Sequence, residues 1–391
     1  MLVPRLRFKE FTDEWNSYRI KDLFVIKNGL NKNKEYFGVG TPIINYMDIN
    51  KNEILTKNKI KGKVTLSPKE INLFKVNKGD LFFARTSETS EEIGFTASLI
   101  EDIENCVYSG FLLKATPLKS NISPLFSGFY FRNPNMRIEI IKHSSITTRA
   151  LTNGTLLYPM IVNIPSIDEQ EKIGKLLILL NKKIELQSKK VNVLKLYKKG
   201  IKNKLLSNSN FEKHSLSEIL EKWNIKNKNN KYNYVESISN KYGFISQEEQ
   251  FSDRSVASKN RSNYYIVMNG IFAYNPSRLN VGSLALKKDN KISLISPLYE
   301  CFKTNQNQDY LFEWFNSIEF KKGADSKFEG GVRNTLNFNN LCKINISLPS
   351  RDIQNKYADI FNFFNIKISF EEAKLIELIE FKKGLMQIMF V

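Results

Sequence analysis

The residue types that most often catalyse reactions are scarce in this chain. It has two histidines and three cysteines, and the cysteines are far apart and outside any CxxC motif; these residues are His143, His214, Cys106, Cys301 and Cys342. A structural zinc site needs four such ligands, and a cysteine nucleophile needs a histidine beside it. We therefore expect no metal site, and thiols that are buried or incidental in a reducing cytosol.

Three acidic residues remain as candidates for catalysis: Glu88, Glu91 and Glu92 in the run RTSETSEEIGF. Carboxylates can hold the metal ions of a nuclease. No partner acid and lysine stand on an adjacent predicted strand at nuclease spacing, so a solvated acidic loop is the preferred interpretation. The chain lacks a GxxxxGK[ST] phosphate loop, and its two Asn-Pro runs lack the rest of an amino-methyltransferase NPPY motif. No catalytic residue is predicted, and the chain is interpreted as a reader of a target and not as an enzyme.

Two loops carry side chains suited to reading the edges of DNA bases. RTS at 85–87 and NPSR at 275–278 each follow an apolar run that is typical of a strand. Arginine pairs bidentately with guanine, and asparagine with adenine. The residues predicted to bind DNA in these loops are Arg85, Thr86, Ser87, Asn275, Ser277 and Arg278. Phosphate contact or a solvated loop is the alternative for each. Tyr46 and Tyr274, beside polar loops, are either core or base-stacking residues.

The charge of the chain also favours a polyanionic partner. Lysine and arginine number 59 against 40 aspartates and glutamates, which gives a net charge of +19. A sequence rich in lysine and asparagine partly reflects genome base composition, but the excess still favours nucleic acid. The sequence has no membrane-spanning apolar run, no signal peptide and no basic amphipathic helix with an aromatic face. We expect a cytoplasmic protein with no membrane partner.

An internal repeat indicates the elements that must position these loops. IPSIDEQEKIGKLL at 164–177 recurs as LPSRDIQNKYADIF at 348–361, which is 184 residues later. The correspondence needs no gap between residues 149–206 and residues 333–390. Each copy opens with Pro-Ser and then an acid, which is typical of a helix start. In the first copy the Ser and the Glu three residues later also fit a capping box.

Arg149 and Arg333 occupy the same position at the start of the two repeated segments. Because both halves share this arginine, it suits contact with the DNA backbone better than sequence reading. Both residues are therefore predicted to bind DNA.

The repeated segments have the apolar rhythm of a coiled coil. Hydrophobic residues recur at spacings of three, four and seven over about four heptads, the period of helices packed along a seam. The residues predicted for the seam are Leu177, Leu180, Ile184, Val191, Leu194, Phe361, Phe364, Ile368, Leu375 and Leu378. Its two polar positions also coincide, as Gln187/Glu371 and Lys198/Lys382. Polar residues on a seam can fix its register.

The flanks of the two helices are complementary in charge. Between Asn181 and Lys204 the first helix has nine lysines and one glutamate, whereas the second has four glutamates in the matching window. We predict that the helices are partners within one molecule and pack mostly antiparallel. The alternative is that each helix packs separately on its own domain. Helices of about 35–40 residues would extend roughly 50–60 Å, more than one DNA turn of about 34 Å.

Upstream of the helices the repeat is looser. Its offset is 196 residues between Tyr18 and His214, so the second module is shorter than the first. Short β-rich runs alternate with turn signals in both modules, for example GTPIINYMDI and VGSLALKK. We predict a mixed α/β (α+β) fold, in which two similar globular modules are joined by two long helices packed as an antiparallel coiled coil, with an intramolecular pseudo-twofold. The predicted boundaries are 1–160, 161–207, 208–343 and 344–391.

Over essentially its whole length, the chain resembles the specificity subunit of Type I restriction-modification systems. The segments that carry this resemblance include VPRLRFKEFTDEW, FFARTSETSEEIG and IPSIDEQEKIGKLL in the first half, and AYNPSRLNVGSLAL and ISPLYECFK in the second. The PS-x-x-x-Q helix start, followed by a long helix that ends near KKGI or KKGL, occurs twice.

The resemblance implies that the modules at 1–160 and 208–343 are target recognition domains, each reading one half of a split, asymmetric site in double-stranded DNA. The helices at 161–207 and 344–391 would then be spacers that dock two methyltransferase (modification) subunits, while motor-nuclease (restriction) subunits cut the DNA. No cofactor is expected in this chain; S-adenosylmethionine, ATP and Mg are expected on the partner subunits. The two rival classes are a stand-alone sequence-specific DNA-binding protein and an enzyme with a nuclease centre at the acidic loop.

Overall fold

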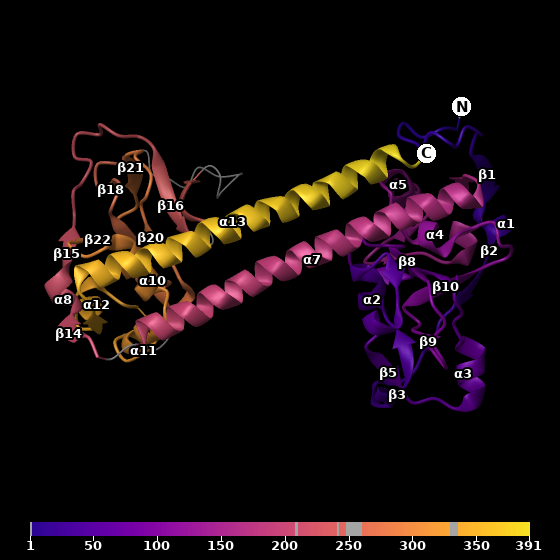
Figure 1. The fold of residues 1–391 in the computed structure, drawn as a ribbon, viewed down its shortest axis with the longest axis horizontal. Coiled ribbons are helices and arrows are strands. Elements are labelled where there is room, and N and C mark those ends of the chain that lie inside the picture. The colour runs from indigo at the N-terminus through magenta and orange to yellow at the C-terminus, as the bar shows by residue number, and fades with distance from the viewer. Residues whose placement is uncertain (1, 208–209, 241, 248–259, 329–334) are drawn as a thin grey trace. The chain divides into compact units, whose positions relative to one another are not determined.

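The computed structural model describes residues 2–207, 210–240, 242–247, 260–328 and 335–391 of the chain. They form two compact units. Unit 1 is Met1–Ser188 with Ala373–Val391, and unit 2 is Lys189–Glu372. Each unit holds one module of strands and short helices. The two long helices, α7 (Ile167–Leu206) and α13 (Arg351–Ile388), each contribute to both units (Figure 1).

The module of unit 1 is built around a sheet with the strand order β2-β10-β6-β8-β4. Smaller sheets have the orders β5-β3-β9, β11-β12-β7 and β1-β13. The strands are β1 Asn16–Arg19, β2 Phe24–Asn28, β3 Phe37–Ile44, β4 Ile54–Leu55, β5 Gly62–Val64, β6 Leu81–Ala84, β7 Thr86–Ser87, β8 Thr96–Leu99, β9 Val107–Tyr108, β10 Leu112–Pro117, β11 Ser145–Ile146, β12 Ala150–Leu151 and β13 Ile161–Ile164. The short helices are α1 Ile20–Leu23, α2 Tyr46–Lys51, α3 Pro68–Phe74, α4 Pro124–Tyr130, α5 Pro134–Lys142 and α6 Gly154–Leu157.

The module of unit 2 repeats part of this plan. Its sheet β15-β22-β19-β20 has the same order and antiparallel pairing as β2-β10-β6-β8, and a second sheet has the order β17-β16-β21-β18. The strands are β14 Glu212–Ser215, β15 Leu220–Trp223, β16 Val235–Ser239, β17 Gly243–Ser246, β18 Tyr265–Val267, β19 Phe272–Tyr274, β20 Leu284–Leu286, β21 Ser293–Ile295, β22 Glu300–Thr304 and β23 Asn345–Leu348. The short helices are α8 Leu216–Ile219, α10 Gln308–Phe315, α11 Ile318–Asp325 and α12 Phe338–Cys342.

A two-stranded sheet leads into each long helix. β1 pairs antiparallel with β13 in unit 1, and β14 pairs with β23 in unit 2. The first strands of these pairs are 196 residues apart and the second strands 184, which are the two offsets of the sequence repeat. The repeat in the sequence is therefore a repeat of topology.

A buried glutamine fixes the start of each long helix. Gln170 and Gln354 are 0% and 1% exposed, and each donates from Nε2 to the carbonyl of the proline five residues before it, at 2.9 Å. Each also accepts a backbone N–H through Oε1, from Ser123 at 2.8 Å and from Asn307 at 3.0 Å. Ser123 and Asn307 are the N-caps of α4 and α10. The PS-x-x-x-Q repeat thus ties each long helix to an earlier helix of its module, α4 in unit 1 and α10 in unit 2.

A second buried polar side chain at the start of α7 is Glu169. The Glu169 carboxylate, which the sequence assigns to a capping box, accepts two hydrogen bonds from the Arg7 guanidinium at 2.8 and 2.7 Å. This hydrogen bond and the charge of Glu169 raise the pKa of Arg7, although burial opposes them. The extended N-terminal segment is thereby held against the first turn of α7.

In unit 1, the first part of α7 and the last part of α13 share one hydrophobic core with the module. Leu177 of α7 is buried in the same cluster as Leu385 of α13 and Met389, the residue after that helix. Phe390, just after α13, packs edge-on against Phe126 of α4, with ring centroids 5.5 Å apart. Both helices are therefore parts of one core and not separate attachments.

In unit 2 the opposite ends of the two helices share a core: the last part of α7 packs with the first part of α13. Leu206 is buried in the same cluster as Ala358 and Phe361. The two helices are thus antiparallel partners, which confirms the predicted fold class. Separate packing of each helix on its own domain is excluded.

The predicted charge complementarity of the helices is realised in unit 2. Lys190 forms an ion pair with Glu371 at 2.8 Å, and Lys195 with Glu372 at 2.6 Å. The seam residues are covered to different degrees. Buried are Leu177, Leu180, Val191, Phe361 and Ile368, and half-buried are Ile184, Leu194, Phe364, Leu375 and Leu378.

Some sequence expectations are corrected by local chemistry. The β-rich run at 40–49 is a strand only as far as Ile44, because the Asn45 backbone N–H donates to the Asp48 carboxylate at 2.8 Å in a capping box that starts α2. The segments at 161–207 and 344–391 each begin with a strand before the long helix. No helix among the described residues is both long and apolar enough to cross a membrane.

Candidate nucleic-acid interface

The predicted reading loop of unit 1 leaves the sheet directly after β6, whose four residues are all buried. Both backbone groups of Arg85, its N–H and its carbonyl, are hydrogen-bonded to neighbouring segments. The Arg85 N–H donates to the Phe111 carbonyl at 2.8 Å, and the Arg85 carbonyl accepts from the Thr152 N–H at 2.9 Å. The next two residues, the half-buried Thr86 and the buried Ser87, form β7.

The pairing of β7 with β12 brings Arg149 to this loop. Ala150 lies opposite Ser87, and Leu151 lies opposite Thr86. Arg149 directly precedes this pair and is exposed in the turn between β11 and β12. Two predicted sites that are far apart in the sequence therefore meet at one edge of a small sheet.

These residues line an open pocket of about 390 Å³. Thr86, Ser87 and Arg149 contribute to its wall. The other lining residues are Tyr46, Glu88, Thr89, Glu92 and Phe111. Phe111 is a large apolar side chain that is 61% exposed, so it offers a face to a ligand instead of filling the core. The pocket combines a cation, hydroxyl groups, carboxylates and an exposed ring.

Tyr46 is half-buried in the pocket wall, and its hydroxyl donates to Glu92 Oε2 at 2.6 Å. Burial and this hydrogen bond both raise the pKa of Tyr46, so the phenol stays protonated as the donor. The Glu92 carboxylate is thereby held in place beside Thr86 and Ser87. A carboxylate in this position could accept a hydrogen bond from the exocyclic amine of a base.

An arginine fixes the backbone of the acidic loop. Arg137 of α5 donates from one nitrogen to the Glu91 carbonyl at 3.0 Å and to the Ile93 carbonyl, and its guanidinium lies 4.8 Å from the centroid of Phe95. Burial and the nearby charge of Arg132 lower the pKa of Arg137 to about 10. The acidic loop is therefore an ordered part of the pocket wall.

The acidic residues are not gathered as a metal centre in the part of the chain that the structure describes. Within those residues no group of three or more His, Cys, Asp or Glu side chains could hold an ion. Glu88 and Glu92 line the pocket, whereas Glu91 accepts a hydrogen bond from the Ser90 hydroxyl at 3.0 Å. The three carboxylates therefore have separate local roles.

Arg85 is less available than its neighbours in the loop. It is half-buried, and its guanidinium lies 3.5 Å from the Gly110 carbonyl. Its Nε is buried and has no hydrogen-bond partner among the described residues. Arg85 is thus not among the residues that line the pocket, and its Nε–H donor is unsatisfied.

The predicted reading loop of unit 2 follows β19, the strand that corresponds to β6. Asn275 Oδ1 accepts from the Ser277 N–H at 3.0 Å, so this side chain closes a turn on its own backbone. The Asn275 N–H donates to the Ser283 carbonyl at 3.0 Å and closes the base of the loop. Ser277 and Arg278 are exposed on this loop, while Asn275 is half-buried.

The sequence also singled out Tyr274, Arg333 and the cysteines. Tyr274 is 0% exposed, and burial strongly raises its pKa, so it is a core residue and not a stacking platform. Arg333 lies outside the described residues. Cys106 and Cys301 are buried free thiols, and burial raises the pKa of Cys106 to about 12.

Part of the chain matches a known family. Residues 12–196 match the model of the Type I restriction modification DNA specificity domain. A protein of Methanocaldococcus jannaschii that carries the name of a type I restriction enzyme MjaX specificity subunit is 27% identical over 227 residues, which are 55% of this chain and 52% of that protein. The chain therefore spans about half the length of this curated relative.

Two solved structures share the fold over nearly the whole chain. The S subunit of a Type-I restriction-modification system from M. genitalium has 12% sequence identity and a TM-score of 0.59, covering 100% of this chain and 99% of that one. A chain from a study of assembly and conformational transition of the type I R-M system has 12% identity and a TM-score of 0.57, covering 95% and 96%. At these identities the likeness concerns the fold, and it agrees with the two modules and two long helices described above.

Proposed function

Since residues 12–196 belong to the Type I restriction modification DNA specificity domain family, we propose that the chain is the DNA-recognition subunit of a Type I restriction-modification complex. Each module reads one half of a split, asymmetric site in double-stranded DNA. The chain itself is non-catalytic and works in the cytoplasm. Cleavage and methylation belong to its partner subunits.

The observation that carries this proposal is the equivalence of the two loops. β6 and β19 occupy the same position in the strand orders β2-β10-β6-β8 and β15-β22-β19-β20. The loops that follow them differ in sequence and in shape. Equivalent loops with different side chains are what a chain needs to read two different half-sites.

Exposed apolar side chains on the long helices support partner binding. Leu179 and Phe363 occupy equivalent positions in the repeat and are 65% and 62% exposed. Tyr197 and Phe381 are another such pair, at 64% and 59%. Large exposed hydrophobic residues of this kind mark protein interfaces. We propose that they dock two methyltransferase subunits, which bind S-adenosylmethionine. ATP and Mg are then cofactors of the motor-nuclease subunits.

The proposal is tested by sequencing the modified bases of a methylation-free host. The chain is expressed with its neighbouring methyltransferase, and native DNA is sequenced for methylated adenine. We expect a split, asymmetric motif that disappears when this chain is omitted. Replacing residues 1–160 with the first module of another family member should change only one half of the motif.

A folded, cofactor-binding methyltransferase that writes no motif with this chain would contradict the proposal. A stand-alone DNA-binding protein would then be the better account. It would be recognised by specific binding of the isolated chain to DNA without a partner.

A further inference from the structure

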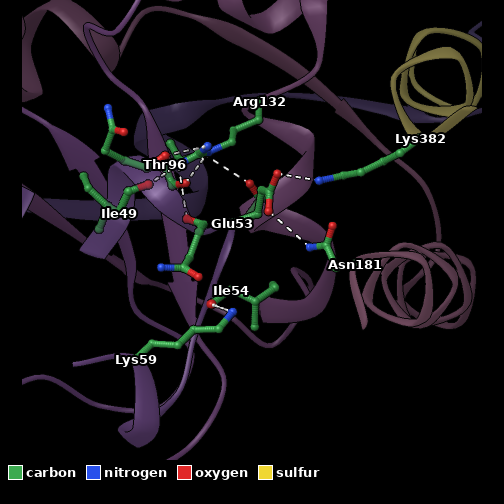
Figure 2. A network of polar contacts seen from close by, with 11 residues as sticks. Ile49, Glu53, Ile54, Lys59, Thr96, Arg132, Asn181 and Lys382 are labelled. Carbon is green, nitrogen blue, oxygen red and sulfur yellow. Dashed lines mark hydrogen bonds and ion pairs between the residues drawn. The ribbon is translucent and has the colours of Figure 1, made fainter. Parts of the chain in front are cut away.

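A half-buried carboxylate of unit 1 joins the module to both long helices. Glu53 stands between α2 and β4. Its Oε1 accepts from Lys382 Nζ of α13 at 2.6 Å, and its Oε2 accepts from Asn181 Nδ2 of α7 at 3.1 Å. Figure 2 shows the two helix side chains reaching the same carboxylate from different helices. The side chains of Glu53 and Lys382 are 18% and 15% exposed.

The environment keeps Glu53 charged. Burial by itself would raise its pKa, but the charges of Lys382 and Arg132 outweigh that effect, so the pKa of Glu53 is lowered. Arg132 is fixed by hydrogen bonds to backbone carbonyls, including that of Thr96 at 2.7 Å (Figure 2). It also donates to the Asn52 carbonyl at 3.1 Å. The module therefore places a fixed positive charge near the Glu53 carboxylate.

Unit 2 contains the same arrangement around Glu313 of α10. Lys198 of α7 donates to Glu313 Oε1 at 2.5 Å, and Asn365 of α13 donates to the same oxygen at 3.3 Å. Lys202 adds a second cation, 3.3 Å from Oε2. Burial would raise the pKa of Glu313, but the charges of Lys198 and Lys202 and the hydrogen bonds from Lys198 and Asn365 lower it overall.

The helix residues of the two sites are related by the internal repeat. Asn181 corresponds to Asn365 and Lys198 to Lys382, at the 184-residue offset. We name each pair a socket. The unit 1 socket is Asn181 with Lys382, and the unit 2 socket is Asn365 with Lys198. In each unit, one helix gives the asparagine and the other gives the lysine.

The glutamates are not related by the repeat. The residue of unit 1 at the position of Glu313 is Phe129 of α4, which is buried. Lys382 Nζ lies 5.5 Å from the centroid of the Phe129 ring, so the lysine occupies the equivalent place. The carboxylate of unit 1 comes from Glu53, in an unrelated segment. Two different modules therefore meet the same socket with a carboxylate from different elements.

We infer that the Asn–Lys sockets are carboxylate-binding sites that orient each module on the helix pair, and that Glu53 and Glu313 are positioning residues for DNA reading. A charged acceptor that touches both helices resists sliding of the module along them. This inference rests on the proposed function for its consequence, since the orientation of a module sets the distance of its half-site from the other.

The socket itself is tested on the full chain by a double-mutant cycle. Glu53→Gln, Lys382→Gln and the double variant are unfolded in urea. We expect the two changes to be coupled by about tenfold in the unfolding equilibrium constant, as buried contacting groups are. The matched control is the exposed ion pair of Lys195 with Glu372, whose Gln variants should be coupled by less than about threefold.

The positioning role is tested by the methylated motif of the assembled complex. Glu53→Gln is expected to add motifs whose spacer differs by one base pair, with both half-sites unchanged, whereas Lys195→Gln keeps the parental spacer. Glu53→Asp keeps the negative charge but has a shorter side chain, so it serves as a milder variant if Glu53→Gln folds poorly. It should add fewer motifs with an altered spacer. A loss of thermal stability alone would not change the spacer.

The outcomes separate the two claims. Additive single changes in the urea cycle would overturn the sockets. Coupled changes together with a strict parental spacer would overturn the positioning role. If the wild-type complex writes no split motif, the proposed function fails, but the urea cycle still decides whether the sockets exist.

Discussion

The two units share one glutamine contact at the start of their long helices but build their reading loops differently. Gln170 and Gln354 make matching hydrogen bonds at the two helix starts. In unit 1, loop 85–87 pairs with a distant hairpin and lines a pocket of about 390 Å³. In unit 2, loop 275–283 is closed on itself by backbone hydrogen bonds and exposes Ser277 and Arg278.

This difference shows which contacts the architecture requires. A contact with the helix pair must be made at each end, because each helix takes part in both units. Buried polar groups there need a partner, so their chemistry can change little. A loop outside the sheet has no such requirement and can change sequence and shape. The division between constant and variable contacts therefore follows from burial.

The largest expected effect is that of removing the buried glutamines at the starts of the two long helices. Gln170→Ala and Gln354→Ala should each lower the free energy of unfolding by about 2–4 kcal/mol, because each leaves a buried N–H without an acceptor and opens a cavity. The measurement is urea unfolding of the full chain. Gln387→Ala, at an exposed position of α13, is the control and should change it by less than about 0.5 kcal/mol. Costs that differ by several-fold between the two glutamines would break the equivalence of the units.

The equivalence of the exposed apolar positions can be tested on partner binding. Tyr197→Glu and Phe381→Glu should each weaken binding of a methyltransferase subunit by about thirtyfold, since a central aromatic side chain commonly contributes roughly 2 kcal/mol. Calorimetric titration measures this, and urea unfolding should be nearly unchanged. Glu380→Gln, also exposed, is the control. An effect of only one of the two Glu variants would mean that the units dock partners differently.

The loops should differ in what they read. Arg278→Ala should weaken DNA binding by about 1–3 kcal/mol through base contacts in its own half-site. Arg149→Ala should also weaken binding, but as a backbone contact it should do so whatever the bases are. Fluorescence anisotropy with duplexes in which one half-site is scrambled measures this. Arg278→Ala should have no further effect once the second half-site is scrambled, whereas Arg149→Ala should still weaken binding when the first is scrambled. An effect of Arg149→Ala that disappears with the first half-site would mean that Arg149 reads bases.

The smallest expected effect is on the stability of the chain at acidic pH. The pKa values of Glu53 and Glu313 are lowered in the folded chain from an ordinary value of 4.5. Their contribution to stability is therefore fully present above about pH 4.5 and is lost as the pH falls through the lowered values. Glu53→Gln and Glu313→Gln should flatten the fall of melting temperature below pH 4.5. Glu372→Gln, at a side chain that is 43% exposed, should leave this fall unchanged. Equal curves for all three variants would contradict the role of the sockets.

Most of the scaffold could be predicted from the sequence. The helix starts, the seam and the polar positions repeat at a fixed offset, and helical periodicity makes their faces readable from local spacing. Arg149 could be singled out because the repeat pairs it with Arg333. Thr86 and Ser87 could be found because they follow a buried strand. Phe111 was missed, since a phenylalanine next to the apolar strand β10 is indistinguishable from a core residue until its exposure is known.

What the sequence determined by itself is therefore the repeat, the two helices with their antiparallel partnership, and the lysine and asparagine positions that became sockets. Only the tertiary structure decided which residues meet across long separations. It placed Tyr46, Glu92 and Phe111 around one pocket, and it paired Lys382 with Glu53, which is 329 residues away. The physical reason is that helical packing leaves a periodic trace in neighbouring residues. A contact made by one carboxylate from an unrepeated segment leaves no such trace.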